Sequence, residues 1–319
     1  MKKICVILSC LILANSLWGA FTDSGWGVRP MGMGGAFTAI AEGPEATYYN
    51  PAGLGFHLKF GASLSYKSMS LDRHMNHVAV SMPIRNEVAM AASWVNAGVS
   101  DVSARGQSRQ LEGTISNSQN AFTLSFAKAL DSTIAFGGTL RYLQEKLDIL
   151  DAFTVGVDLG FLVHLRQLIF IGGTVQNLGS TMRWDSAKYW NDGTAYDENL
   201  PVVAKFGVAG NLFSGKFIPA VDFEKSNKMN LRFRTGAEYW FVKKVMRRVE
   251  DEYEEGKFTD VPEYVRFAGL RVGLDRGSLT FGASYAYHIK DTSIALEYAY
   301  LTGQQGTSTG HLFTLKLGL

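Results

Sequence analysis

Two groups of residues near the start of this chain could support binding chemistry by their type and spacing. Residues 32–35 read GMGG, and His74 and His77 lie three positions apart. A phosphate-binding loop follows a strand and continues into Lys and then Ser or Thr, which this glycine run does not do. The two histidines have no third metal ligand nearby, so we interpret them as ordinary polar residues of a loop. The sequence therefore predicts neither a phosphate site nor a metal site here.

Residues for covalent catalysis are also missing. The few serines in the predicted strands have no identifiable histidine partner. The only cysteines, Cys5 and Cys10, lie in a segment that we expect to be removed, so the mature chain has no thiol for a disulfide, a zinc site or a nucleophile. We therefore predict no catalytic residue, no cofactor and no enzymatic activity.

Three arginines, Arg141, Arg232 and Arg234, form a third group. A guanidinium group pairs well with a carboxylate, so these side chains could hold the anionic head group of a ligand. The other reading, which we favour, is that they balance the acidic residues Glu87, Asp158 and Glu238.

The first twenty residues have the features of a secretory signal peptide. Lys2 and Lys3 precede an apolar stretch, and small residues follow near residue 20. A lipoprotein site at Cys10 is the alternative, but the apolar stretch before it is short. Removing residues 1–20 leaves 29 basic and 29 acidic residues, a balance that gives no reason to expect a nucleic-acid partner.

From residue 56 onward the chain is a series of segments in which apolar and polar residues alternate, the pattern of β-strands. In residues 152–165, for example, one face carries Phe153, Val155, Val157, Leu159, Phe161 and Val163. We predict about fourteen strands, near 57–69, 75–84, 86–98, 119–129, 132–146, 151–165, 167–178, 201–211, 215–225, 229–242, 264–274, 277–290, 292–302 and 310–319.

Two all-β architectures could use this alternation: a soluble sandwich and a closed transmembrane barrel. The export signal, strands longer than the average of about 5–6 residues, and polar faces that include Lys59, Lys67, Glu87, Lys205 and Glu297 favour the barrel. We therefore predict a single antiparallel barrel over residues 56–319 in an outer membrane, with lipid around it.

Connection lengths predict which end of the barrel is which. The long gaps 99–118, 179–200 and 303–309 all follow odd-numbered strands, so they should be extracellular loops. The stretch 243–263 should lie at the opposite, periplasmic end. Its apolar residues have helical spacing, but its charges oppose the helix dipole, so a short amphipathic helix and a solvated charged loop stay equally open.

Residues 21–55 do not alternate and are rich in glycine and alanine. Residues 29–39 read RPMGMGGAFTA and residues 46–54 read ATYYNPAGL, and together they resemble the start of the FadL superfamily of outer-membrane transporters. The likeness is nearer to its shorter PorV/PorQ branch. Further blocks agree: AGVSD at 97–101, VQNLG at 175–179, GAEYW at 236–240 and LEYAY at 296–300.

This resemblance implies a fourteen-stranded barrel with residues 21–55 as a plug in its lumen. It also implies that the plug contacts a hydrophobic ligand, and that a kink in the third strand opens the wall sideways near Asn96, Ala97 and Gly98. The plug residues that we expect at the ligand or at the plug turn are Met31, Met33, Phe37, Ile40, Asn50, Pro51 and Ala52. Asn50 should bridge backbone groups at that turn. The chain is shorter than typical fatty-acid transporters of the superfamily and ends in Leu319 rather than an aromatic residue.

Three functions are compatible with this pattern. The first is passive transport of a fatty-acid-like hydrophobic small molecule. The second is a PorV-like accessory role in type IX protein secretion, in which the loops 99–118 and 179–200 would bind secreted cargo or a translocon. The third is a surface antigen without a conduit. We favour transport because it is the broader property of the superfamily.

Overall fold

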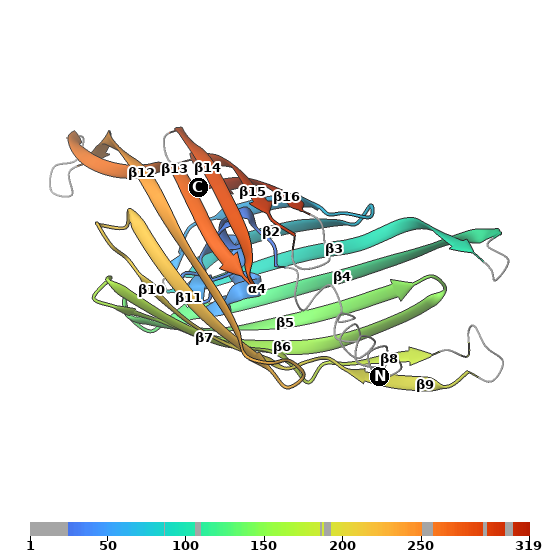
Figure 1. The fold of residues 1–319 in the computed structure, drawn as a ribbon. Coiled ribbons are helices and arrows are strands. Elements are labelled where there is room, and N and C mark those ends of the chain that lie inside the picture. The colour runs from blue at the N-terminus through green and yellow to red at the C-terminus, as the bar shows by residue number, and fades with distance from the viewer. Residues whose placement is uncertain are drawn as a thin grey trace, which may run out of the picture.

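The structure is a computed structural model that describes residues 25–85, 87–105, 110–185, 187, 193–250, 258–289, 292–303 and 309–319. The predicted signal peptide, residues 1–20, lies outside these ranges. Within them the chain forms one closed barrel with its N-terminal segment inside (Figure 1).

Fourteen antiparallel strands make the barrel wall, as predicted, and neighbours in sequence are neighbours in space. The barrel closes where β1 pairs with β16, from Gly61 opposite Gly318 to Ser68 opposite His311. The wall strands are β1 (Gly61–Ser68), β2 (His74–Arg85), β3 (Val88–Arg105), β4 (Leu111–Ala129), β5 (Ile134–Leu147), β6 (Leu150–Leu165), β7 (Ile169–Leu178), β10 (Val203–Gly210), β11 (Phe217–Ser226), β12 (Arg232–Glu250), β13 (Phe258–Asp275), β14 (Ser278–Ile289), β15 (Thr292–Leu301) and β16 (Gly310–Gly318).

The alternation in the sequence separates the two faces of this wall. On β6, Phe153 and Leu159 are more than half exposed on the outside, whereas Asp158 is buried on the inside. Similar exposed apolar side chains surround the barrel, a surface that suits hydrocarbon and not water. Closure leaves no unpaired backbone edge along this belt. No helix in the described ranges is both long enough and apolar enough to cross a membrane.

Residues 25–56 lie inside the barrel, and we call them the luminal segment (Figure 1). They form four short helices, α3 (Val28–Gly32), η1 (Gly43–Glu45), α4 (Ala46–Tyr49) and η2 (Pro51–Phe56). Their largest side chains make an apolar core with the wall in which Trp26, Phe37 and Tyr49 are almost fully buried. The first strand therefore begins at Gly61, a few residues later than the alternation suggested.

Two of the predicted long loops contain strands instead. The gap 99–118 is mostly a continuation of the β3–β4 hairpin, because β3 runs to Arg105 and β4 begins at Leu111. The gap 179–200 contains a separate two-stranded sheet of β8 (Thr181–Asp185) and β9 (Ala195–Asn199). Pairing between the strands satisfies backbone groups that a loop would leave to water, so polar composition alone did not reveal these strands.

The described parts of the stretch 243–263 are strands, not the helix or the loop that the sequence left open. In the described part, β12 continues to Glu250 and β13 starts at Phe258, and the two strands stay paired. This pairing extends beyond the last contacts of β12 with β11 and of β13 with β14, so the hairpin projects from the barrel (Figure 1). The β-branched Val242 and Val245, two of the residues whose spacing suggested a helix, suit an extended ribbon better.

Two residues that we assigned to the polar lumen are elsewhere. Lys59 precedes β1 and is exposed, and Glu87 is exposed in the β2–β3 turn with a positive φ of 67°. Both lie just past a strand end, where the alternating pattern no longer reports which way a side chain points.

Candidate functional site: the seam between the luminal segment and the wall

Three pairs of glycines in the wall let the luminal segment approach closely. Each pair lies directly across neighbouring strands: Gly137 with Gly160, Gly172 with Gly207, and Gly236 with Gly273. Because glycine has no Cβ, two backbones can meet where any other residue would hold them apart.

Each glycine pair receives a different piece of the luminal segment. Asn50 and Pro51 lie on the first pair, Thr38 and Ala39 on the second, and Met33 and Gly34 on the third. A Cβ placed on Gly137 would lie 2.5 Å from the carbonyl carbon of Pro51, well inside contact distance. The wall is therefore shaped to this backbone path at three places around its circumference.

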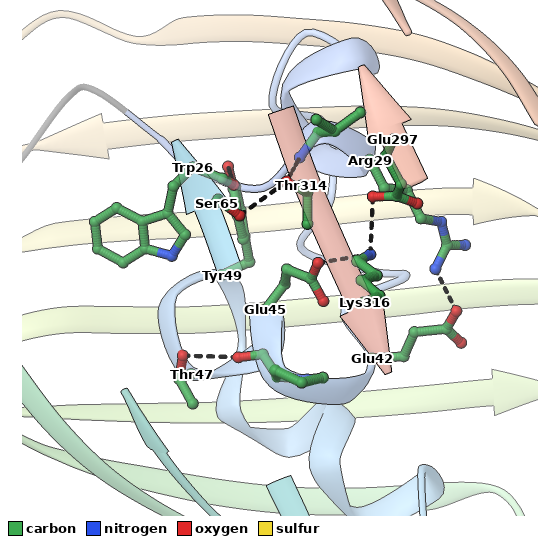
Figure 2. A network of polar contacts seen from close by, with 12 residues as sticks. Trp26, Arg29, Glu42, Glu45, Thr47, Tyr49, Ser65, Glu297, Thr314 and Lys316 are labelled. Atoms are coloured by element: carbon green, nitrogen blue, oxygen red, sulfur yellow. Dashed lines mark hydrogen bonds and ion pairs between the residues drawn. The ribbon is translucent and has the colours of Figure 1, made fainter. Parts of the chain in front are cut away.

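Buried ion pairs join the luminal segment to strands β12 and β13. The Arg29 guanidinium contacts the Glu238 carboxylate at 2.5 Å, and the Arg271 guanidinium contacts the same carboxylate at 3.0 Å. Arg29 also pairs with Glu42 in its own segment (Figure 2). Burial would lower the pKa of Arg29, but the Glu238 and Glu42 carboxylates outweigh this effect and raise it, so Arg29 stays charged.

A second ionic contact lies at the seam with β15 and β16. The Lys316 ammonium lies 2.6 Å from the Glu45 carboxylate of the luminal segment and 3.2 Å from the Glu297 carboxylate of the wall (Figure 2). Next to it, the Val28 backbone amide donates to the Thr314 hydroxyl at 3.3 Å. Together with Glu238, these residues fix one side of the luminal segment by charge.

Hydrogen bonds, and not ion pairs, join the rest of the luminal segment to the wall. The Asp222 carboxylate on β11 accepts from the backbone amides of Phe37 and Thr38 at 3.0 and 2.9 Å. The Gln176 amide on β7 donates to the carbonyl oxygen of Tyr48 at 2.5 Å.

Asn50 makes the bridge that the sequence predicted. Its side-chain amide donates to the carbonyl oxygens of Thr38 and Phe161, both at 2.9 Å, and its side-chain oxygen accepts from the Ala52 amide at 3.2 Å. Because Thr38 belongs to the luminal segment and Phe161 to β6, one buried side chain joins the segment to itself and to the wall.

The predicted ligand residues have different surroundings. Met33 and Phe37 are buried in the shared core, and Met31 packs against a small cluster that includes Leu301. Pro51 and Ala52 are buried in η2. Ile40 differs from the others because it lines a cavity.

The three predicted head-group arginines are all occupied by carboxylates. Arg141 pairs with Asp158, Arg232 lies 3.5 Å from Glu224, and Arg234 lies 2.8 Å from the same Glu224. These contacts agree with the charge-balancing interpretation, although Glu238 is balanced by Arg29 and Arg271 rather than by these three.

Asn96, Ala97 and Gly98 lie in an unbroken part of the wall. Both ladders of β3 continue through them, to β2 on one side and to β4 on the other. The irregularity in the β3–β4 ladder lies immediately after them, between Val99 and Val102, and β2 pairing ends at Gly98. Beyond Gly98, β3 is paired along one edge only, with β4.

The histidines that we considered for metal binding do not come together. His77 is buried in the lumen and stacks on Trp26 at 5.2 Å, whereas His74, three positions away, points to the other face of β2. Among the described residues no group of three potential ligands forms. Residues 306–310 have Gly-x-Ser-x-Gly spacing, but Gly310 begins strand β16, whereas a nucleophile elbow leads into a helix.

A cavity of about 250 Å³ lies at the end of the barrel that has the short β6–β7 and β10–β11 turns. Ile40 and Glu42 of the luminal segment line it together with Arg266 of β13. The sequence did not single out Arg266. The alternation of β13 places odd-numbered residues such as Arg271 inside, and so predicts that Arg266 points outward.

A β-bulge reverses that expectation. Phe241 pairs with Ala268 and Val242 with Arg266, which leaves Phe267 as an extra residue. Phe267 consequently joins the outer aromatic side chains Phe241 and Tyr285, and Arg266 turns toward the interior. Bulges are known to redirect side chains in this way, but alternation in one strand cannot reveal them because they depend on register with a neighbour.

Comparison with known proteins places the fold. No family model matches the sequence, and no curated protein matches it. Several solved structures match almost the whole chain, among them the following three. The toluene transporter TbuX of Ralstonia pickettii has a TM-score of 0.59 at 15% identity, covering 93% of this chain and 98% of its own.

A Pseudomonas aeruginosa FadL homologue has a TM-score of 0.61 at 11% identity, covering 92% of this chain and 98% of its own. The toluene transporter TodX of Pseudomonas putida has a TM-score of 0.59 at 13% identity, with 92% and 97% covered. The chain therefore has the fold of the FadL- and TodX-type barrels, with its N-terminal segment enclosed in the wall.

Proposed function

We propose that this protein is an outer-membrane channel for passive uptake of hydrophobic small molecules, with the luminal segment as its plug. The observation that carries the proposal is the match of the whole fold, wall and luminal segment together, to structures described as toluene transporters. The apolar outer belt, which suits a bilayer, supports the location.

The route that we propose leaves the lumen sideways beside β3. Asn96, Ala97 and Gly98 lie where the β2 ladder ends and next to the irregular part of the β3–β4 ladder, so few backbone hydrogen bonds need to break there. The alternative route, straight through the lumen, would require the ion pairs of Arg29 and Lys316 to separate. Breaking buried ion pairs is costly, which favours the lateral route.

Uptake of radiolabelled toluene or a fatty acid by a deletion strain, with and without the restored gene, tests transport. Restored uptake of a hydrophobic compound supports the proposal. Equal uptake of these hydrophobic compounds by both strains would rule the proposal out, because permeation through the lipid would then account for all of the uptake.

A disulfide that can be reduced tests the lateral route. Ala97 and Gln119 are direct partners across β3 and β4, so the double substitution Ala97→Cys and Gln119→Cys should lock this part of the wall. Ala209→Cys with Ala220→Cys, partners across β10 and β11, is the matched control. We expect oxidation to block uptake in the first variant and a reductant to restore it, with no change in the control.

A PorV-like accessory role in protein secretion is the second candidate. The observation in its favour is the β3–β4 hairpin, on which Val102, Leu111 and Ile115 are exposed in the part that extends past β2. Together with the β8–β9 sheet it would present a surface to secreted cargo. Specific co-purification with a secreted protein, lost when residues 99–118 are shortened, would support this role over transport.

A further inference from the structure

Arg266 differs from the other arginines that face the interior of the barrel. Arg29, Arg141, Arg232, Arg234 and Arg271 each have a carboxylate within ion-pair distance. Among the described residues, no carboxylate lies within 4.0 Å of the Arg266 guanidinium. A cation without a paired anion at a half-enclosed site is costly unless a bound anion or water compensates it.

The contacts of Arg266 fix its orientation and leave donors free. One terminal nitrogen donates to the carbonyl oxygen of Gly215 at 3.0 Å, and the guanidinium lies 5.3 Å from the ring centre of Trp240. A guanidinium has five N–H donors, so most of them remain available to the cavity that Arg266 lines. The one carboxylate of the cavity lining, Glu42, forms its ion pair with Arg29 and acts on Arg266 only at longer range.

One side of the cavity wall is apolar and aromatic, whereas polar side chains such as His57, Gln167 and Asn211 line the rest. His164 stacks on Phe56 at 4.0 Å and contacts the Phe170 ring at 4.3 Å, which makes a continuous row of rings. Ile40, Leu162 and Ile218 complete the apolar lining. A cavity of about 150 Å³ holds benzene, so 250 Å³ is enough for a monoaromatic acid.

We propose that this cavity binds a small hydrophobic carboxylate of the size of benzoate. The carboxylate accepts two hydrogen bonds from the planar guanidinium of Arg266, and the apolar part lies against the ring row of Phe56, His164 and Phe170. The bulge at Phe267 creates the site, because it turns Arg266 inward. Binding here does not require transport, so the two proposals can fail separately.

Binding of benzoate to the purified full chain in an uncharged detergent tests the proposal. Saturation-transfer NMR would give affinities for benzoate and, as an uncharged analogue of similar shape, for toluene. We expect Arg266→Gln to weaken benzoate binding by at least about tenfold, the usual effect of losing a hydrogen bond to a charged group, and to change toluene binding less than about twofold. Arg266→Lys keeps the charge but loses the planar fork, so its benzoate affinity should lie between those of the unmodified protein and Arg266→Gln.

A matched control separates this contact from general electrostatics. Arg166, in the β6–β7 turn at the same end of the barrel, is exposed and does not line the cavity, so Arg166→Gln removes one positive charge without touching the site. Its benzoate affinity should equal that of the unmodified protein. Equal loss in both variants would overturn the proposal.

A second variant keeps the test decisive if Arg266→Gln does not fold. Gln167 is an exposed turn residue that lines the cavity mouth, so Gln167→Glu should leave the fold intact and repel a carboxylate. Benzoate affinity should fall severalfold while toluene affinity is unchanged. Absence of saturable benzoate binding in the unmodified protein, or benzoate binding that neither Gln167→Glu nor an Arg266 variant weakens, would refute the site.

Discussion

The luminal segment is held by different forces on the two sides of the barrel. Toward β12, β13 and β16 it is held by buried charges, with Arg29 on Glu238 and Glu45 on Lys316. Toward β5, β6 and β7 it is held by neutral contacts, chiefly Asn50 and the wall glycines. The charged side depends on every partner being present, because one missing partner leaves an uncompensated charge. The neutral side depends on shape, so removing one contact there costs only the free energy that this contact contributes.

Removing the Glu238 carboxylate should have the largest effect on this comparison. Glu238→Gln leaves the buried Arg29 and Arg271 with too little negative charge, so we expect a loss of about 3–5 kcal/mol in unfolding free energy. Heat-modifiable migration of the purified barrel on gels, or urea unfolding in detergent, would measure it. Glu87→Gln changes an exposed carboxylate in the β2–β3 turn and is the control. Similar stability of the two variants would mean that charge does not hold this side.

Filling one member of a glycine pair should come next. A Cβ on Gly137 would overlap the backbone of Pro51 and Ala52, so Gly137→Ala should displace the luminal segment and cost up to about 3 kcal/mol. Gly138→Ala on β5 is the matched control, since its Cβ would meet neighbours only at an ordinary 3.6 Å. Greater sensitivity of the barrel to protease at the luminal segment in the first variant alone would confirm the close contact.

Loss of the Asn50 bridge should be milder. Asn50→Ala leaves the buried carbonyl oxygens of Thr38 and Phe161 without their donor, which we expect to cost about 2 kcal/mol. The loosened plug should also let cells take up more of a large antibiotic, measured as a lower inhibitory concentration. Asn230→Ala, at an exposed position, should change neither property. An unaltered inhibitory concentration for Asn50→Ala would argue against a sealing role.

Acid should produce the smallest effect, and only on the charged side. Burial would raise the pKa of Glu42, but Arg29, with help from His57 and Arg266, lowers it from 4.5 to about 2. A carboxyl with a depressed pKa in the folded state stabilises that state above its unfolded pKa and loses the effect as the pH falls toward the folded value. Stability of the native barrel relative to Glu42→Gln should therefore shrink between about pH 4.5 and 2. A constant difference over this range would contradict the assignment.

The sequence could predict which residues face in and out because alternation reports the face of a strand directly. Phe153 outside and Asp158 inside follow from it, and so does the count of fourteen strands. The alternating pattern misplaced residues that lie just past strand ends, such as Glu87. For residues 243–263 the sequence left a helix and a solvated loop equally open, whereas pairing between β12 and β13 decided the structure of the described part.

The candidate site was less predictable than the fold. The NPA sequence at residues 50–52 identified Asn50, because an Asn before Pro in a glycine-rich stretch commonly organises a turn. Arg266 carried no such signal, since the bulge that turns it inward exists only in the register of β12 with β13.

Composition and periodicity by themselves determined an alternating all-β chain with a small-residue N-terminal segment, because one chain's local pattern is enough to assign faces and turns. Only the tertiary structure decided that glycines far apart in sequence, such as Gly236 and Gly273, lie side by side beneath the luminal segment. It also decided that Glu238 pairs with Arg29 and that Arg266 has no carboxylate partner among the described residues. These outcomes depend on closure and strand register, which bring together residues that no local pattern connects.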